Sequence, residues 1–334
     1  MHRTTGSEDL TSSTHSARSA CRALVRPVAV ARCEIDPLLV AAGPTGAAGF
    51  AVGHEAVAEV VELGPEVRAV TVGQLVLCSF QVSCGQCTSC GAGHTANCDN
   101  YPVLSDYGMR SLSGAEYGGM LSDLVCVPHA DAMFVPVSQG VDPVDLASVP
   151  DNVLDGYRSV APHLAEQPGA DVMVVCHGNR SIALYAAQAA VALGAQSVTF
   201  ASDDVAALEC ASSLGSRAVP TAFGRRIDRW PLVVDCGTTS QGLAYALAST
   251  KPEGILHSVS YYAEPAPMVP LGRLYTLGIR FQIGRAHSAA LLPEVAALIA
   301  SGRLSPADVT SRVIDWEDAP GQYLDETIKL VVTR

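Results

Sequence analysis

Four cysteines lie within fifteen residues of this 334-residue chain, in the segment SCGQCTSCGAGHTANC. They are Cys84, Cys87, Cys90 and Cys98. A tetrahedral zinc ion needs four thiolates that converge at about 2.3 Å, and a short Gly-rich loop can supply them from one stretch of chain. A pair of disulfides is the alternative, but it needs an oxidising compartment, to which nothing in the sequence points. The spacing therefore predicts a structural zinc site.

A second group of metal-ligand residues lies upstream of this loop. It consists of Cys33 in ARCEID and of His54, followed by Glu55, in VGHEA. A thiolate and an imidazole are good zinc ligands, and two protein ligands leave room for more. A single histidine near a strand end more often only forms hydrogen bonds. It is therefore the order of the motifs along the chain that favours a second metal site.

The elements that must position these residues change in character near residue 150. Before it, short apolar runs broken by Gly and Pro, such as ALVRPVAVA, AVAEVVELG and GQLVLCSF, predict β-strands. After it, apolar strands such as VMVVC, SVTFAS and LVVDC alternate with helical segments such as SIALYAAQAAVALGA. This alternation predicts a parallel sheet covered by helices on both faces. The last strand, TIKLVVTR, is expected to return to the first half.

The composition and charge of the chain exclude some classes of binding partner. A net charge of −12 and a pI near 5.1 argue against nucleic acid or an acidic membrane surface. No run of eighteen apolar residues is present, so we expect no membrane span. Residues 1–20 are rich in Ser and Thr and lack an apolar segment, which is typical of a flexible tail. The cysteines fit a reducing cytoplasm with a metal site better than a secreted disulfide framework.

The order of these features resembles the zinc-containing medium-chain alcohol dehydrogenases. A Cys, a Gly-His-Glu, a four-cysteine loop and an α/β half follow one another, and GHEAVAEVVELGPEVRAVTVGQLV is a recognisable stretch of that family. The resemblance covers Ala23 to Arg334. It implies an α/β protein with a GroES-like β-rich catalytic domain, formed by residues 21–154 and 287–334. It also implies a Rossmann-type, doubly wound parallel-sheet domain, formed by residues 155–286.

The resemblance also implies a catalytic zinc held by Cys33, His54 and Asp151. A fourth position stays open there for the substrate oxygen. Glu55 is then the neighbouring carboxylate that approaches the zinc during ligand exchange. Asp36 accepts a hydrogen bond from His54 and fixes its tautomer. For Asp151 the alternative is a helix N-cap before NVLDGYRSV.

Two residues beside the first ligand depart from the family pattern. The family usually has a hydroxyl two residues after that cysteine, which passes the alcohol proton outward, but this chain has Ile35. Either the proton leaves through water, Glu55 or Asp36, or the reaction needs no relay. Glu34 is acidic where many relatives are basic or polar.

The nucleotide half departs as well. Relatives carry G-x-G-x-x-G in the turn after the first strand, which lets the backbone approach a pyrophosphate, whereas CHGNRSIA keeps only Gly178. The ribose-binding carboxylate of NAD-selective relatives falls at Ser202, next to Asp203 and Asp204. Arg180 is either a phosphate counter-charge or a solvated residue at a helix start, and NAD versus NADP stays open. The implied cofactor contacts are Gly178, Asn179, Arg180, Ser181, Ile182, Ser202, Asp203 and Ser260.

The leading hypothesis is a cytoplasmic oxidoreductase with two zinc ions per chain and NAD or NADP. It transfers a hydride between the nicotinamide and a small alcohol or carbonyl substrate. Like its relatives, it is expected to form a homodimer or homotetramer. The altered turn and Ile35 leave two alternatives open. One is a redox-neutral zinc Lewis-acid enzyme for elimination or isomerisation, and the other is a ligand-binding protein without catalysis.

Overall fold

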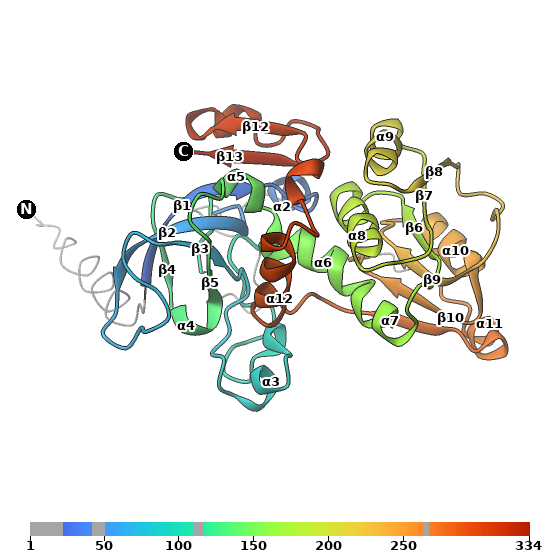
Figure 1. Cartoon of the computed structure of the whole chain (residues 1–334), viewed down its shortest axis with the longest axis horizontal. Helices are drawn as coiled ribbons and strands as arrows, with labels where there is room; N and C mark the ends of the chain where they lie inside the picture. The colour runs from blue at the N-terminus through green and yellow to red at the C-terminus, as the bar shows by residue number, and fades with distance from the viewer. Residues whose placement is uncertain (1–22, 42–50, 110–116, 263–266) are drawn as a thin grey trace, which may run out of the picture.

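The computed structural model describes residues 23–41, 51–109, 117–262 and 267–334. The predicted tail, residues 1–20, lies outside them. Two sheets organise the chain and stand beside each other in Figure 1. In that view helices α6 (Leu154–Arg158) and α12 (Ser288–Ala300) lie between the two sheets.

The first sheet is mixed and has seven strands. They are β1 (Ala23–Ala31), β2 (Glu55–Leu63), β3 (Leu75–Cys78), β4 (Val125–Val127), β5 (Phe134–Pro136), β12 (Arg312–Asp315) and β13 (Leu330–Thr333). Their order is β12-β13-β1-β2-β3-β5, and β4 also pairs with β1. Because β13 pairs antiparallel with β1, placing Ala31 opposite Val331, the predicted return of the last strand to the first half is confirmed.

The second sheet has six strands, and all its pairings are parallel. In spatial order they are β11 (Arg280–Ile283), β10 (Thr250–Ser258), β9 (Trp230–Asp235), β6 (Val172–Cys176), β7 (Val198–Ser202) and β8 (Arg217–Pro220). Every residue of β6 and β7 is buried. Val172 and Val174 pack in one apolar layer, and Met173 and Val175 in another. The predicted parallel sheet with two helical faces is confirmed.

Helices cover both sheets and the loops between them. The remaining α-helices are α2 (Asp36–Ala41), α3 (Thr88–Gly91), α4 (Ala130–Met133), α5 (Pro143–Leu146), α7 (Ala161–Glu166), α8 (Arg180–Ala192), α9 (Val205–Ser213), α10 (Ser240–Ser249), α11 (Leu271–Leu277) and α13 (Ala319–Gln322). Short 3₁₀ segments span Thr95–Asn97, Pro306–Val309 and Trp316–Asp318, and a π-helical segment spans Val149–Val153. Among the helices of the described ranges, none is long and apolar enough to cross a bilayer.

The contact between α6 and α8 sets the position of the site. A Cβ on Gly156 would lie 2.6 Å from the backbone nitrogen of Ala186, so only glycine allows the two helices to approach this closely. The π-helical segment runs directly into α6. The approach therefore brings Asn152 to the start of α8, where Ser181 Oγ lies 2.8 Å from Asn152 Oδ1.

Candidate functional site

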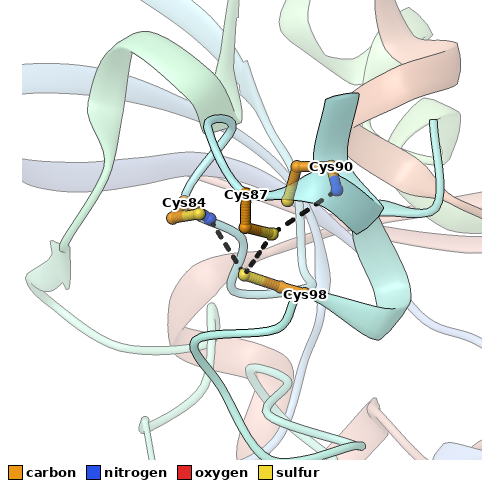
Figure 2. A group of neighbouring side chains, drawn as sticks. All are labelled: Cys84, Cys87, Cys90 and Cys98. Carbon is orange, nitrogen blue, oxygen red and sulfur yellow. Dashed lines mark hydrogen bonds between the residues drawn. The ribbon is translucent and has the colours of Figure 1, made fainter. Parts of the chain in front are cut away.

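The four cysteines of the predicted structural zinc site converge, as Figure 2 shows. Their sulfur atoms all lie within 4.8 Å of one another. Cys87 Sγ and Cys98 Sγ are 3.8 Å apart, and zinc with four bonds of 2.3 Å places its sulfurs about 3.8 Å apart. The loop that carries them, with α3, projects away from the first sheet in Figure 1. This donor set and its spacing fit zinc.

Hydrogen-bond donors surround these sulfurs. Cys84 N donates to Cys98 Sγ at 3.4 Å, and Asn100 Nδ2 donates to Cys84 Sγ at 3.2 Å. Burial opposes ionisation of Cys84, but the backbone N–H groups of Gln86 and Cys87 outweigh it and lower its pKa to about 6. Because the thiolate is the form that binds metal, the loop already favours the ligand state at this sulfur.

A second cluster consists of Cys33, His54, Glu55 and Asp151. One ligand atom from each lies within 4.8 Å of the others. The pairing of β1 with β2 sets Ala31 opposite Glu55 and so brings the ends of two strands together. Asp151 comes from the π-helical segment. Thiolate, imidazole and carboxylate form a donor set that suits zinc, so the residues present fit this metal.

The His54 ring lies between two carboxylates, Asp36 on the Nδ1 side and Asp151 on the Nε2 side. Its Nδ1 lies 3.4 Å from Asp36 Oδ1, and its Nε2 lies 3.3 Å from Asp151 Oδ2. Asp36 Oδ2 in turn accepts hydrogen bonds from Cys33 N at 3.0 Å and Tyr323 OH at 2.6 Å. Burial opposes the charged imidazole, but Asp36 and Asp151 raise its pKa above the ordinary value. The Nε2 atom therefore faces the centre of the cluster.

Asp151 does not cap a helix. It lies inside the π-helical segment, whose N-cap position is Ser148 and which has no side-chain cap. The carboxylate instead accepts a hydrogen bond from Asn152 Nδ2 at 3.0 Å and faces His54. The helix-cap alternative is therefore wrong for this residue.

Sequence analysis missed two buried residues behind the cluster. Lys329 Nζ donates to Glu55 Oε1 and Oε2 at 2.7 and 2.9 Å and to Asn152 Oδ1 at 2.5 Å. Burial alone would lower the pKa of the Lys329 amine, but Glu55 raises it above its usual value. Asn152 Nδ2 also contacts Cys33 Sγ at 3.2 Å. One signal was available, because Lys329 is one of two lysines in the chain and stands beside an apolar run.

The predicted cofactor residues lie along the carboxyl edge of the second sheet. Gly178 follows β6 with φ of +136°, and a Cβ there would lie 2.5 Å from Thr238 Oγ1, so glycine is required. Asn179 holds the N-cap position of α8, and its Nδ2 donates to Ser260 Oγ at 3.4 Å. Ile182 lies in the first turn of α8. These residues are brought together where such folds bind a dinucleotide.

Two basic side chains on this edge are in contact with aspartate carboxylates of the same chain. Arg180 Nη1 pairs with Asp204 Oδ2 at 3.1 Å, so Arg180 is not a freely solvated residue. Asp203, just after Ser202 at the end of β7, lies 3.5 Å from His177. The basic side chains of this edge are thus already in contact with acidic ones.

Comparisons with known proteins agree with this geometry. Residues 19–138 match the family model described as alcohol dehydrogenase GroES-like domain. A probable zinc-binding alcohol dehydrogenase of Mycobacterium tuberculosis is 29% identical over 284 residues, which are 82% of this chain and 70% of the relative. A glutathione-independent formaldehyde dehydrogenase of Bacillus subtilis is 27% identical, over 88% of this chain and 81% of the relative.

The fold has the same relatives among solved structures. The alcohol dehydrogenase TADH from Thermus sp. ATN1 superposes with a TM-score of 0.84 at 25% identity, covering 93% of this chain and 92% of that chain. The predicted α/β fold, with a GroES-like β-rich part and a Rossmann-type parallel sheet, is confirmed. Residues 19–138 belong to the alcohol dehydrogenase GroES-like domain family, and the chain as a whole resembles zinc-containing alcohol dehydrogenases in sequence and in fold.

Proposed function

We propose that the protein is a zinc-dependent oxidoreductase that transfers a hydride between NAD or NADP and an alcohol or aldehyde. The observation that carries the proposal is the convergence of Cys33, His54 and Asp151 beside the carboxyl edge of a parallel sheet. Curated relatives include alcohol and formaldehyde dehydrogenases, so small primary alcohols and aldehydes are the first substrates to test. These relatives do not favour the redox-neutral alternative.

We assign the metal to Cys33, His54 and Asp151. When bound, zinc supplies Lewis acidity to an alcohol or carbonyl oxygen, and the nicotinamide ring supplies or accepts the hydride. Asp36 holds the His54 ring so that Nε2 faces the metal position. Asn152 is a positioning residue, because its amide touches both Cys33 Sγ and Asp151 Oδ2.

The alcohol proton needs a route that does not use the position of Ile35. The two nearby carboxylates are already held by buried donors: Glu55 by Lys329, and Asp36 by Tyr323. A hydrogen bond to a carboxylate lowers its affinity for a proton, but burial outweighs the Lys329 amine and raises the pKa of Glu55 to about 7. We therefore propose that the proton leaves through water or through Glu55.

We also propose that the protein is a homodimer or homotetramer and works in the cytoplasm. Strand β11 is the outer strand of the second sheet, and Ile283 on it is 57% exposed. Tyr275 and Leu271 of the neighbouring α11 are exposed as well. Light scattering on the purified protein tests the oligomeric state.

The metal assignment is tested with Cys33→Ala. The wild-type protein should contain about two zinc ions per chain, one for each ligand cluster. The variant should retain about one and lose hydride transfer, followed as NADH absorbance with alcohols and aldehydes, because one ligand of the open site is gone. Cys78→Ala is the matched control, since Cys78 is a buried free thiol of the same sheet.

Two results would contradict the proposal. Full activity of the metal-free protein would rule out zinc catalysis. Retention of both zinc ions in Cys33→Ala would remove Cys33 from the metal site. An equal loss in Cys78→Ala would trace the effect to the fold of the sheet and not to the ligand.

A further inference from the structure

The start of α8 is occupied by a carboxylate from the opposite half of the chain. Glu34 Oε1 accepts a hydrogen bond from Ser181 N at 2.7 Å, and Glu34 Oε2 accepts one from Ser181 Oγ at 2.6 Å. The helix's own N-cap residue, Asn179, makes no capping hydrogen bond. Glu34 therefore satisfies donors of the first turn and sets a negative charge at the positive end of the helix.

This is the position that a dinucleotide would need. In parallel α/β sheets the pyrophosphate binds at the N-terminus of the helix after the first strand, on free backbone N–H groups. Here that helix is α8, which follows β6 directly. The Glu34 carboxylate uses the same kind of donor as a phosphate and carries the same sign of charge.

Two basic side chains of the edge, Arg180 and His177, also contact carboxylates. Arg180, which could meet a phosphate, is paired with Asp204 at 3.1 Å and lies 3.5 Å from Glu326. His177 lies 3.5 Å from Asp203. Every one of these contacts is made by an acid of the chain itself, so the edge is filled with the chain's own anions.

We propose that Glu34 is an internal competitor of the dinucleotide pyrophosphate. The inference rests on the proposed function. Without a dinucleotide, the Glu34 carboxylate accepts hydrogen bonds from Ser181, and a dinucleotide binds only when Glu34 leaves. Glu34 thereby weakens dinucleotide binding relative to a chain with a neutral residue at this position.

The Ser181 hydroxyl connects Glu34 to the residues that hold the metal ligands. Ser181 Oγ lies within hydrogen-bond distance of both Glu34 Oε2 and Asn152 Oδ1, at 2.6 and 2.8 Å. A hydroxyl has one proton to donate, so Ser181 serves one acceptor at a time. When Glu34 leaves, that proton turns to Asn152, whose amide contacts Cys33 and Asp151. Dinucleotide binding and the geometry of the metal cluster are thus linked.

Calorimetric titration of the zinc-loaded protein with NADH, NADPH and ADP-ribose tests the proposal. Glu34→Gln removes the charge but keeps one acceptor, and Glu34→Ala empties the position. Loss of a charge-assisted contact corresponds to about a tenfold or larger change in Kd. We expect both variants to bind NADH or NADPH more tightly than the wild type by that factor, with a similar gain for ADP-ribose. Because ADP-ribose lacks nicotinamide, its gain locates the effect at the pyrophosphate.

Controls separate this effect from loss of charge or of fold. Glu62→Gln removes the same charge from an exposed position on β2 and should leave each Kd unchanged. Zinc content and circular dichroism check that the Glu34 variants are folded, since α8 loses a stabilising charge. If the wild type binds a dinucleotide and neither variant binds it more tightly, the competitor role is overturned while the proposed function stands. A gain for NADH without one for ADP-ribose also overturns it. No binding of any dinucleotide to any variant overturns both the inference and the proposed function.

Discussion

The ion pair between Glu55 and Lys329 lies fully buried beside the metal cluster. Both side chains are fully buried, and they are 274 residues apart in sequence. Removing two charges from water is unfavourable, and the pair is tolerated only because each charge has partners. Glu55 receives two hydrogen bonds from the amine, and the third goes to Asn152.

Lys329→Met tests this interaction. It leaves the Glu55 carboxylate buried without its counter-charge, so we expect a loss of about 3–5 kcal/mol in the free energy of unfolding. Urea denaturation at constant zinc concentration measures it. The other lysine of the chain provides the control, since Lys251 is exposed and Lys251→Met should change stability by less than about 0.5 kcal/mol.

The double variant Glu55→Gln with Lys329→Met distinguishes charge from packing. It removes both charges and should recover part of the stability that Lys329→Met loses. If the double variant is less stable than the sum of the two single variants predicts, the cost does not come from an unpaired charge.

At the scale of residues, sequence reasoning located the metal-ligand candidates but not the residues that hold them. Cys33, His54 and Asp151 stand in recognisable motifs, and the structure brings them together. Lys329 and Asn152 stand in no motif, and their contacts depend on how distant segments pack. The acidic character of Glu34 was visible in the sequence. Its contact with Ser181 was not, because the two residues are 147 positions apart, one in the turn after β1 and the other in α8.

At the scale of elements, the close contact of α6 with α8 depends on one residue. Gly156 faces the backbone of Ala186, and a side chain there has no space. The same contact holds the π-helical segment, and with it Asp151, against the start of α8.

Gly156→Ala should therefore separate the two helices. Its Cβ would meet backbone atoms that cannot rotate away, so we expect a loss of about 1–3 kcal/mol in the free energy of unfolding. Activity should fall as well, because Asp151 moves with the segment. Gly272 is the matched control: it also lies in a helix, and a Cβ there meets nothing within 4 Å. An unchanged or higher stability of Gly156→Ala would show that α6 and α8 are not tightly packed.

Among the predicted strands, β6 and β7 are buried along their whole length, whereas β1 has one exposed and two half-buried residues. β6 and β7 are apolar or small at every position, because helices cover both faces of the sheet. β8 and β12 were not predicted, because β8 lies at the edge of its sheet with its residues half-buried or exposed, and β12 has one buried residue. The π-helical segment has no sequence signature and is recognised only from its backbone.

At the scale of the whole molecule, a buried histidine makes stability depend on pH. His257, on β10, contacts His163 at 2.9 Å and Arg158 at 2.8 Å, so it links α7 and α6 to the second sheet. Burial lowers the pKa of His257 to about 2, with Arg158 and His163 adding to the effect. In the unfolded chain a histidine binds its proton near pH 6.5.

The unfolding free energy should therefore fall as the pH falls below about 6.5. Below this pH, His257 binds a proton in the unfolded chain but not in the native protein, so acid favours unfolding. Between pH 7 and pH 5 this amounts to about 2 kcal/mol from His257. His257→Gln removes the titrating group, and its stability should fall by about 2 kcal/mol less than that of the wild type over the same interval. Urea titrations at both pH values measure the difference.

The exposed His94 provides the control for this measurement. His94→Gln removes an exposed histidine, so a general effect of deleting a histidine would appear in this variant as well. If His257→Gln and the wild type lose the same stability between pH 7 and pH 5, the acid sensitivity arises elsewhere in the molecule.

The pairing of β13 with β1 has a consequence for synthesis on the ribosome. Residues 29–31 of β1 pair with β2 on one side, but their partners on the other side are residues 331–333, which are synthesised about 300 residues later. Until Lys329 has also been made, the Glu55 carboxylate lacks its counter-charge. A nascent chain can therefore complete its parallel sheet before Lys329, the counter-charge of Glu55, is made. Cleavage by a protease between β11 and β12 would leave all six strands of the second sheet in one piece. It would separate β12 and β13 from the other strands of the first sheet.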